Sequence, residues 1–346
     1  MCPKGPDQSL PLHGMVLGPA VLSPDGQTIV FSILNPVGGL YKVATDGTGF
    51  QPIISDEKFV VDPVFSPDGT KILFSLITDQ KGAICEIRAD GASQITSLTS
   101  GPNNDYSPVY SPDGSKIYFL RAQTFRNYSP IARPAWHDVD IYSMDADGKN
   151  VTKITHENNY AMSTLSISPQ GEALVKMGID DPVWLVPLND PSNKTHVGPD
   201  LDKHQDIDYS PMRNAQFSQD GAKVLYTVPD NEELYIMDRK TGTDERIWTW
   251  ESAKAWTSPE LREKRLPSRM YPRFSADGKR IVFSTATRYD IGPRGALQVL
   301  AICGKSVDPY AIMPKLWIIN ADGTGLQPVD IKVTEKEQGE AEAAPK

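Results

Sequence analysis

The chain has 346 residues, of which 39% are hydrophobic and 23% charged, and its formal net charge is −9. This is the composition of an ordinary soluble globular protein, and no apolar run approaches the roughly 18 residues of a membrane-spanning helix. The negative charge, with no cluster of Lys and Arg, argues against nucleic acid and against anionic membrane surfaces as partners.

The first segment, residues 1–14, precedes the repeats described below and is interpreted as a short lead. Cys2 follows the initiator Met and precedes Pro3 and Lys4, a pattern similar to the first residue of a mature bacterial lipoprotein that has been given a start codon. A lipid anchor at Cys2 is therefore one alternative, and a misplaced start or an unremarkable cysteine is the other. No signal peptide is visible, so export cannot be inferred from the residues alone.

From residue 23 onward the tetrapeptide Ser-Pro-Asp-Gly recurs. It is intact at 23–26, 66–69 and 111–114, and it returns in altered form at 168–171, 218–221 and 275–278. These six copies are spaced 43, 45, 57, 50 and 57 residues apart. Such spacing indicates a repeat protein with one structural unit for each copy.

The third copy shows what one unit contains. Alternating residues over 106–110 lead into the turn, and further strands are predicted at 116–120, 140–144 and 150–154. β-branched and aromatic residues with a period of two, separated by Asp-Gly, are typical of antiparallel hairpins. Four-stranded sheets cannot bury both faces alone, so the units must stack around an axis. The sequence predicts an all-β fold, a six-bladed β-propeller of four-stranded antiparallel blades.

The propeller is predicted as a single domain over residues 15–332. Its six blades are expected at about 15–54, 60–98, 105–155, 162–199, 210–250 and 270–332. Residues 333–346 are rich in Glu, Ala and Lys and are expected to form a disordered charged tail. Each blade is complete in sequence, yet residues 8–17 could add a strand beside blade 6, so the way in which the ring closes stays open.

The pattern Ser-Pro-Asp-Gly-x-x-Ile-x-Phe, followed by Ile-Tyr-x-Met-x-Ala-Asp-Gly, resembles the repeat of TolB-like propellers, which are distantly similar to WD repeats. Members of that family include the periplasmic TolB protein, oligogalacturonate lyases and the gating domains of prolyl-oligopeptidase-like enzymes. The resemblance implies a periplasmic or extracellular location. TolB also carries an α/β domain before its propeller, and the lead here is short, so we expect this chain to differ from TolB in its role.

Extra sequence is predicted on one face of the propeller. Residues 121–139 and 285–315 would lengthen the loops between the second and third strands of blades 3 and 6, and 200–209 and 251–269 would lengthen links between blades, with a short helix near 259–265. Loops on a rigid scaffold often carry binding, and Arg and aromatic residues anchor protein interfaces. Tolerated drift in surface loops is the alternative for these insertions. For the apolar stretch from Leu297 to Cys303 in the blade 6 loop, a lid that packs on the propeller and binds nothing is an equally plain account. The candidate partner-binding residues are Arg121, Phe125, Arg126, Tyr128, Arg133, Trp136, Trp256, Arg288 and Tyr289.

The links between blades also bring polar residues toward the mouth of the central channel. The candidates there are Asp62, Asp105, Asn158, Asp208, His156 and His204. Carboxylate and amide oxygens could hold Ca²⁺ or another divalent cation, and the resemblance to the lyases implies a divalent metal held largely by His. None of the five His matches a lyase motif, and a wet, polar channel mouth without any cofactor explains the same residues.

No linear motif of a hydrolase, a nucleotide-binding loop or a haem site is present in the sequence. The leading interpretation is a non-catalytic scaffold, or a subunit of an envelope complex, that binds a protein partner through the insertion-rich face. One alternative is a metal-assisted lyase or hydrolase acting on carbohydrate at the channel. The other is a module that binds or senses a small ligand.

Overall fold

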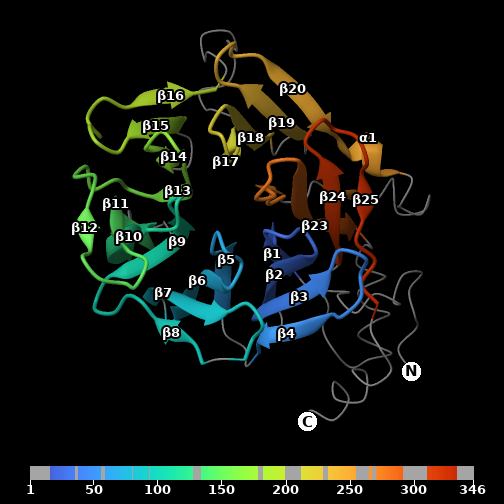
Figure 1. Ribbon diagram of the computed structural model, residues 1–346, viewed down its shortest axis with the longest axis horizontal. Helices are drawn as coiled ribbons and strands as arrows, with labels where there is room; N and C mark the ends of the chain where they lie inside the picture. The colour runs from blue at the N-terminus through green and yellow to red at the C-terminus, as the bar shows by residue number, and fades with distance from the viewer. Residues whose placement is uncertain are drawn as a thin grey trace.

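A computed structural model describes residues 16–35, 38–55, 59–79, 81–92, 94–127, 134–177, 182–198, 212–228, 233–254, 265–266, 270–290 and 310–332. Six antiparallel sheets stand around a central axis, one for each copy of the repeat (Figure 1). The predicted fold class, a six-bladed β-propeller of four-stranded blades, is confirmed.

The first three blades follow one another along the chain. Blade 1 contains β1 (Val16–Leu22), β2 (Thr28–Asn35), β3 (Leu40–Ala44) and β4 (Gln51–Ile54). Blade 2 contains β5 (Phe59–Phe65), β6 (Lys71–Thr78), β7 (Lys81–Arg88) and β8 (Thr96–Ser97). Blade 3 contains β9 (Asn104–Tyr110), β10 (Lys116–Asn127), β11 (Pro134–Asp145) and β12 (Thr152–Lys153).

The other three blades complete the ring. Blade 4 contains β13 (Met162–Ile167), β14 (Glu172–Met177), β15 (Val183–Pro187) and β16 (Thr195–Val197). Blade 5 contains β17 (Arg213–Phe217), β18 (Lys223–Val228), β19 (Glu233–Asp238) and β20 (Asp244–Trp248). Blade 6 contains β22 (Arg273–Phe274), β23 (Arg280–Asp290), β24 (Tyr310–Asn320) and β25 (Gln327–Pro328), with β21 (Arg265–Leu266) paired to the far end of β23.

Helix is almost absent from the described part of the chain. A single turn, α1 (Trp250–Ala253), follows β20. The short helix expected near 259–265 falls mostly outside the described residues, and its last position, Arg265, lies in β21. Among the helices that the structure describes, none has the length and apolarity to cross a bilayer.

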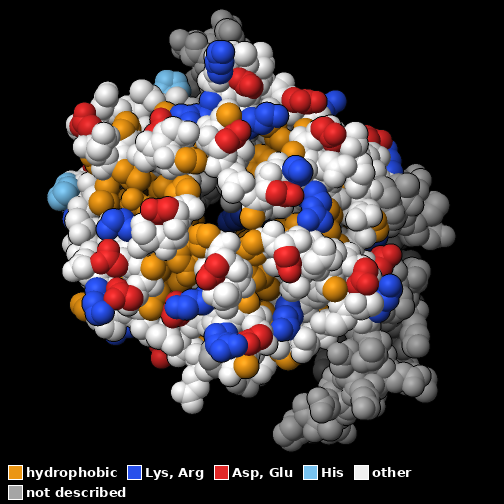
Figure 2. All heavy atoms as spheres, in the orientation of Figure 1, with side chains coloured by type: hydrophobic (Ala, Val, Ile, Leu, Met, Phe, Trp, Pro, Cys, Tyr) orange, Lys and Arg blue, Asp and Glu red, His pale blue; other side chains and the backbone are white. Residues whose placement is uncertain are grey.

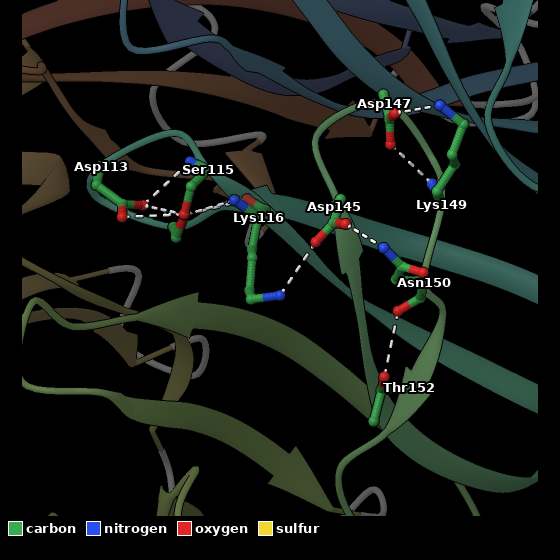
Figure 3. Close-up of polar contacts among 9 residues, drawn as sticks. Asp113, Ser115, Lys116, Asp145, Asp147, Lys149, Asn150 and Thr152 are labelled. Carbon is green, nitrogen blue, oxygen red and sulfur yellow. Dashed lines mark hydrogen bonds and ion pairs between the residues drawn. The ribbon is translucent and has the colours of Figure 1, made fainter.

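The Ser-Pro-Asp-Gly tetrapeptide forms the tight turn between the first two strands of a blade. In blade 3 the Ser111 hydroxyl donates to Asp113 Oδ1 at 2.6 Å and accepts from the backbone N–H of Lys116 at 2.9 Å. Asp113 also accepts from the Ser115 N–H (Figure 3). Gly114 takes the positive φ of 72° that the turn requires. A side chain would strain that conformation, which explains the glycine at this position.

The second turn of the blade uses the same chemistry. In blade 3 the turn between β11 and β12 places Asp147 against Lys149, while Asp145 joins Lys116 of β10 to Asn150 (Figure 3). Side-chain bonds to nearby backbone and polar groups are what allow Asp, Asn and Ser to specify turns. The interpretation of both short motifs as turn signals therefore agrees with their structure.

Two segments expected as loops are strands. Residues 121–127 of β10 pair with 134–140 of β11 in an unbroken register from Arg121↔Asp140 to Asn127↔Pro134. In the same way, β23 and β24 pair as far as Asp290↔Tyr310. The expectation of long loops over 121–139 and 285–315 was wrong for these parts, because the hydrogen-bond ladder continues outward and satisfies the backbone groups of the inserted residues.

The hydrophobic core lies between neighbouring blades. One cluster unites Leu17 and Phe31 of blade 1 with Val282 and Ile318 of blade 6. The same two blades are tied where the Ser284 hydroxyl donates to the Gly18 carbonyl at 2.6 Å. Among the described residues each sheet takes its strands from one continuous stretch of chain, so the ring closes by packing between blades.

Of the segment that might have added a strand to blade 6, residues 16–17 belong to β1 and pair with β2. Residues 8–15, with the rest of the lead and Cys2, lie outside the described residues. The tail at 333–346 lies outside them too.

Candidate functional site

The six inner strands enclose a cavity of about 640 Å³ along the propeller axis. Its rim includes turn residues such as Ser66, Pro67, Ser111 and Pro112, so the cavity reaches the face that carries the Ser-Pro-Asp-Gly turns. Figure 2 shows a hollow at the centre of the ring, with hydrophobic side chains around it and a basic side chain within it. The channel is therefore a concave site to which all six blades contribute.

In each blade, the residues that line the channel lie at fixed sequence positions before the serine of the Ser-Pro-Asp-Gly turn. Side chains two apart on a strand share a face, and the position two residues before each turn serine lines the cavity in every blade. In chain order these residues are Val21, Val64, Val109, Ser166, Gln216 and Arg273. Blades 1 to 3 thus supply an apolar wall, and blades 4 to 6 supply a polar one.

A second level lies four residues before the turn serine. Its members are Pro19, Asp62, Ser107, Thr164, Asn214 and Tyr271. The ladder between the first two strands is interrupted near this level in blades 1 to 5. Four of these residues adopt a left-handed backbone with φ between 52° and 59°. Non-glycine residues seldom take this conformation, and such strain is concentrated at functional sites.

Asp62 and Arg273 are two of the charged residues that line the channel. Asp62 Oδ2 accepts a hydrogen bond from Ser107 Oγ at 3.0 Å, and Arg273 Nη1 donates to the Pro272 carbonyl at 3.0 Å. No ion pair within 4.0 Å joins the two side chains, both of which the structure describes. Asp62 and Arg273 are each partly buried, and both line the cavity.

Burial dominates the electrostatics of these two groups. It raises the pKa of Asp62, an effect that the guanidinium of Arg273 and the hydrogen bond from Ser107 oppose. Burial also lowers the pKa of Arg273, against the opposing influence of Asp62. The channel therefore disfavours an isolated charge of either sign and rewards a close counter-charge.

Four of the six residues predicted at the channel mouth are described by the structure, and of these four Asp62 lies on the cavity wall. Asp105 instead binds Arg121 across β9 and β10, with Nε–Oδ1 at 2.6 Å and Nη2–Oδ2 at 2.8 Å. His156 and Asn158 are exposed in the link after β12, where Asn158 accepts from Lys153. Asp208 and His204 lie outside the described residues.

These residues are not brought together into a metal site in the described part of the chain. No three His, Cys, Asp or Glu side chains gather there in a way that could hold a metal ion. The binding of Ca²⁺ or another divalent cation at the channel mouth stays a prediction.

The predicted partner-binding residues divide into four groups. Arg121 is held inside blade 3 by Asp105, and its side chain is 14% exposed. Phe125 and the Arg126 side chain, 38% and 64% exposed, lie at the outer end of β10, and Trp136 is half-buried against Tyr106 with ring centroids 4.5 Å apart. Arg288 and Tyr289 lie in β23 with only their backbone described, and Tyr128, Arg133 and Trp256 lie outside the described residues.

Sequence reasoning missed the polar wall of the channel. Gln216 and Arg273 are inconspicuous in the sequence because neither belongs to a motif. A signal was nevertheless present, since counting two residues back from each turn serine would have aligned them with Val21, Val64 and Val109.

Structural comparison places the chain among β-propellers. TolB from Acinetobacter baumannii matches with a TM-score of 0.53 and 17% identity over 89% of this chain, and this chain covers 61% of that one. An oligogalacturonate lyase in complex with manganese gives a TM-score of 0.51 and 12% identity over 93% of this chain and 81% of that one. A structure of a nidogen/laminin complex gives a TM-score of 0.51 and 13% identity, with 66% of this chain and 78% of that chain covered. Because these sequence identities are all below 25%, the similarity to the three structures shows a shared fold and nothing more.

No curated protein matches the chain in sequence. The family model described as the TolB beta propeller domain matches residues 12–196, which is more than half of the chain. The chain therefore belongs to the TolB beta propeller domain family.

Proposed function

We propose that this TolB-like propeller is a non-catalytic interaction module, a scaffold or subunit of an envelope complex in the periplasm or outside the cell. It binds a protein partner through the outer part of the β10–β11 hairpin. The observation that supports this function best is the exposure of Phe125 and Arg126 on a hairpin that projects beyond its blade.

The projection follows from strand length. β10 and β11 have 12 residues each, whereas the corresponding second strands of blades 1 and 2, β2 and β6, have eight. Four additional residues at about 3.3 Å each extend the hairpin by about 13 Å. Because β10 runs away from its Ser-Pro-Asp-Gly turn, the extension points toward the face opposite the turns.

The base of the hairpin is held rigidly. The Trp136 ring packs on Tyr106, and the His137 ring meets Tyr160 edge-on with centroids 4.4 Å apart. Thr124 Oγ1 donates to Asp138 Oδ2 at 2.8 Å. A surface that is already ordered loses little entropy when a partner binds, which favours affinity.

The chemistry of the outer end suits a protein partner. Phe125 is one of three exposed large hydrophobic residues in the described part of the chain, with Phe59 and Val151. Arg126 follows it, and its guanidinium lies 3.7 Å from the Asp138 carboxylate, which is a long ion pair. Aromatic residues, Phe among them, and Arg are enriched in the cores of protein interfaces.

The test is affinity purification of the tagged protein from its native envelope fraction. We expect wild type to retain a stoichiometric protein and the double variant Phe125→Ser/Arg126→Ala to lose it. Both side chains are exposed, so the free energy of unfolding should change by only about 0.5 kcal/mol.

The matched control is Phe59→Ser, which removes an equally exposed phenylalanine from blade 2. It should keep the partner. Undiminished capture by the double variant, or equal loss in the control, would reject the hairpin as the binding surface. The absence of any stoichiometric partner for wild type would reject the scaffold function itself.

A further inference from the structure

We propose that the central channel binds a small organic carboxylate with an apolar body. The carboxylate pairs with Arg273, and the apolar body lies against Val21, Val64 and Val109. This site is separate from the hairpin of the proposed function, so either proposal can fail without the other.

The size of the cavity fits such a ligand. Small-molecule sites usually enclose about 300–1,000 Å³, and the channel encloses about 640 Å³. All six inner strands contribute to its wall, so its shape is set by the most constrained part of the fold. The site is therefore preformed by the propeller.

The apolar wall has surface left to cover. Val64 and Val109 are half-buried and face the cavity, next to the buried Val21. Apolar surface in contact with channel water is unfavourable, and an apolar group that displaces the water removes this cost. The three valines come from consecutive blades and form one continuous side of the ring.

The opposite wall supplies fixed hydrogen-bond donors. Ser166 Oγ accepts from the Phe217 N–H at 3.0 Å, and Gln216 Oε1 accepts from the Phe274 N–H at 2.8 Å. These bonds to the next blade orient both side chains and use one acceptor site of each oxygen. The Ser166 hydroxyl hydrogen and the Gln216 amide NH₂ remain to donate, which suits a ligand rich in acceptors.

The charged residues of the cavity lining favour an anionic ligand. Among the described residues of the cavity lining, the guanidinium groups of Arg213 and Arg273 outnumber the single carboxylate of Asp62, in a chain whose net charge is −9. Arg273 makes no ion pair with Asp62, and the Asp62 carboxylate already accepts a hydrogen bond from Ser107. An arginine fork matches a carboxylate in a two-point contact, which is among the strong hydrogen-bonded pairs in proteins.

The test measures binding of hexanoate and phenylacetate to the full chain by calorimetry and ligand-observed NMR, beside the neutral hexanamide and phenylacetamide. Each carboxylate should bind at least about tenfold more tightly than its amide, the factor expected for a charge-assisted hydrogen bond. Arg273→Gln should remove this preference. Val64→Asn should weaken all four probes and leave the preference in place.

The control for net charge is Arg126→Gln on the hairpin, which should change no affinity. A second variant, Asp62→Asn, removes the protein carboxylate that repels an anionic ligand, so it should bind hexanoate and phenylacetate more tightly. This variant tests the site even if Arg273→Gln does not fold. The proposal is overturned if no probe binds, if amides bind as well as carboxylates, or if Asp62→Asn leaves carboxylate affinity unchanged or lower.

Discussion

At the scale of single residues, the turn aspartates are held by several hydrogen bonds each. Asp68 Oδ1 accepts from the Ser66 hydroxyl at 2.5 Å, from the Thr70 N–H at 3.0 Å and from the Thr70 hydroxyl at 2.9 Å. These bonds stabilise the ionised carboxylate and lower the pKa of Asp68 from 3.8 to about 2. Asp113 shows the same effect for the same reason.

This shift predicts a pH-dependent contribution to stability. A carboxyl whose pKa is lower in the folded state stabilises the fold above its unfolded value of 3.8, and the contribution disappears as the pH falls toward 2. Asp68→Asn should therefore be less stable than wild type in urea unfolding at pH 7, and the difference should shrink between pH 4 and pH 2. The control Glu245→Gln alters an exposed carboxylate of β20. A difference between Asp68→Asn and wild type that stays constant with pH would contradict the assignment.

The residue scale also shows where sequence reasoning stops. The turn function of Ser, Asp and Gly was predictable because it depends on neighbours within five positions. The pairing of Arg121 with Asp105 was not, since the sequence placed Arg121 in a loop and Asp105 at the channel. Their contact depends on the register Arg121↔Asp105 between β10 and β9, which only the assembled sheet defines.

At the scale of elements, blades 2 and 3 approach each other closely at Gly82 of β7. A Cβ at this position would lie 2.6 Å from the Asp105 carbonyl oxygen of β9. The Gly82 N–H donates to the side-chain oxygen of Asn104, Oδ1, at 3.2 Å, so the β7 backbone also contacts a side chain of β9 here. The absence of a side chain is thus a packing requirement between two sheets.

Gly82→Ala should therefore destabilise the protein. The methyl group forces β7 and β9 apart, and overpacking of this kind typically costs about 1–3 kcal/mol. Urea unfolding would measure the change, with Thr78→Ala at the exposed end of the same hairpin as a control expected within about 0.5 kcal/mol. Equal stability of the two variants would show that the blades adjust without cost.

Strands were predictable from alternation and hairpins from their turns, but the outward extension of blades 3 and 6 was not. Arg and Pro within 121–139 are typical of loops, and nothing local reveals that Phe125 faces Trp136 across a ladder. The polar wall of the channel was hidden for a related reason. Its side chains come from four different blades when Asp62 is included, and only the ring brings them together.

At the scale of the whole molecule, the ring closes where blade 6 and the chain after it meet blade 1. Val329 and Ile331 follow β25 and are buried in the cluster that contains Phe31 and Val43 of blade 1. The Lys332 N–H donates to the Gly47 carbonyl at 2.7 Å. The sequence left closure open because these contacts join residues almost 300 positions apart.

Truncation at two nearby positions tests this closure. A chain ending at Pro328 loses two buried aliphatic side chains and the bond to Gly47, and it should lose roughly 3–6 kcal/mol of unfolding free energy. A chain ending at Lys332 keeps all three contacts and should match the full-length protein in urea unfolding. If both truncated chains are equally stable, residues 329–332 do not close the ring, and the packing of β1 against β23, with the Ser284–Gly18 bond, must hold it instead. If the shorter chain alone is destabilised, closure depends on this four-residue segment as well as on the blades.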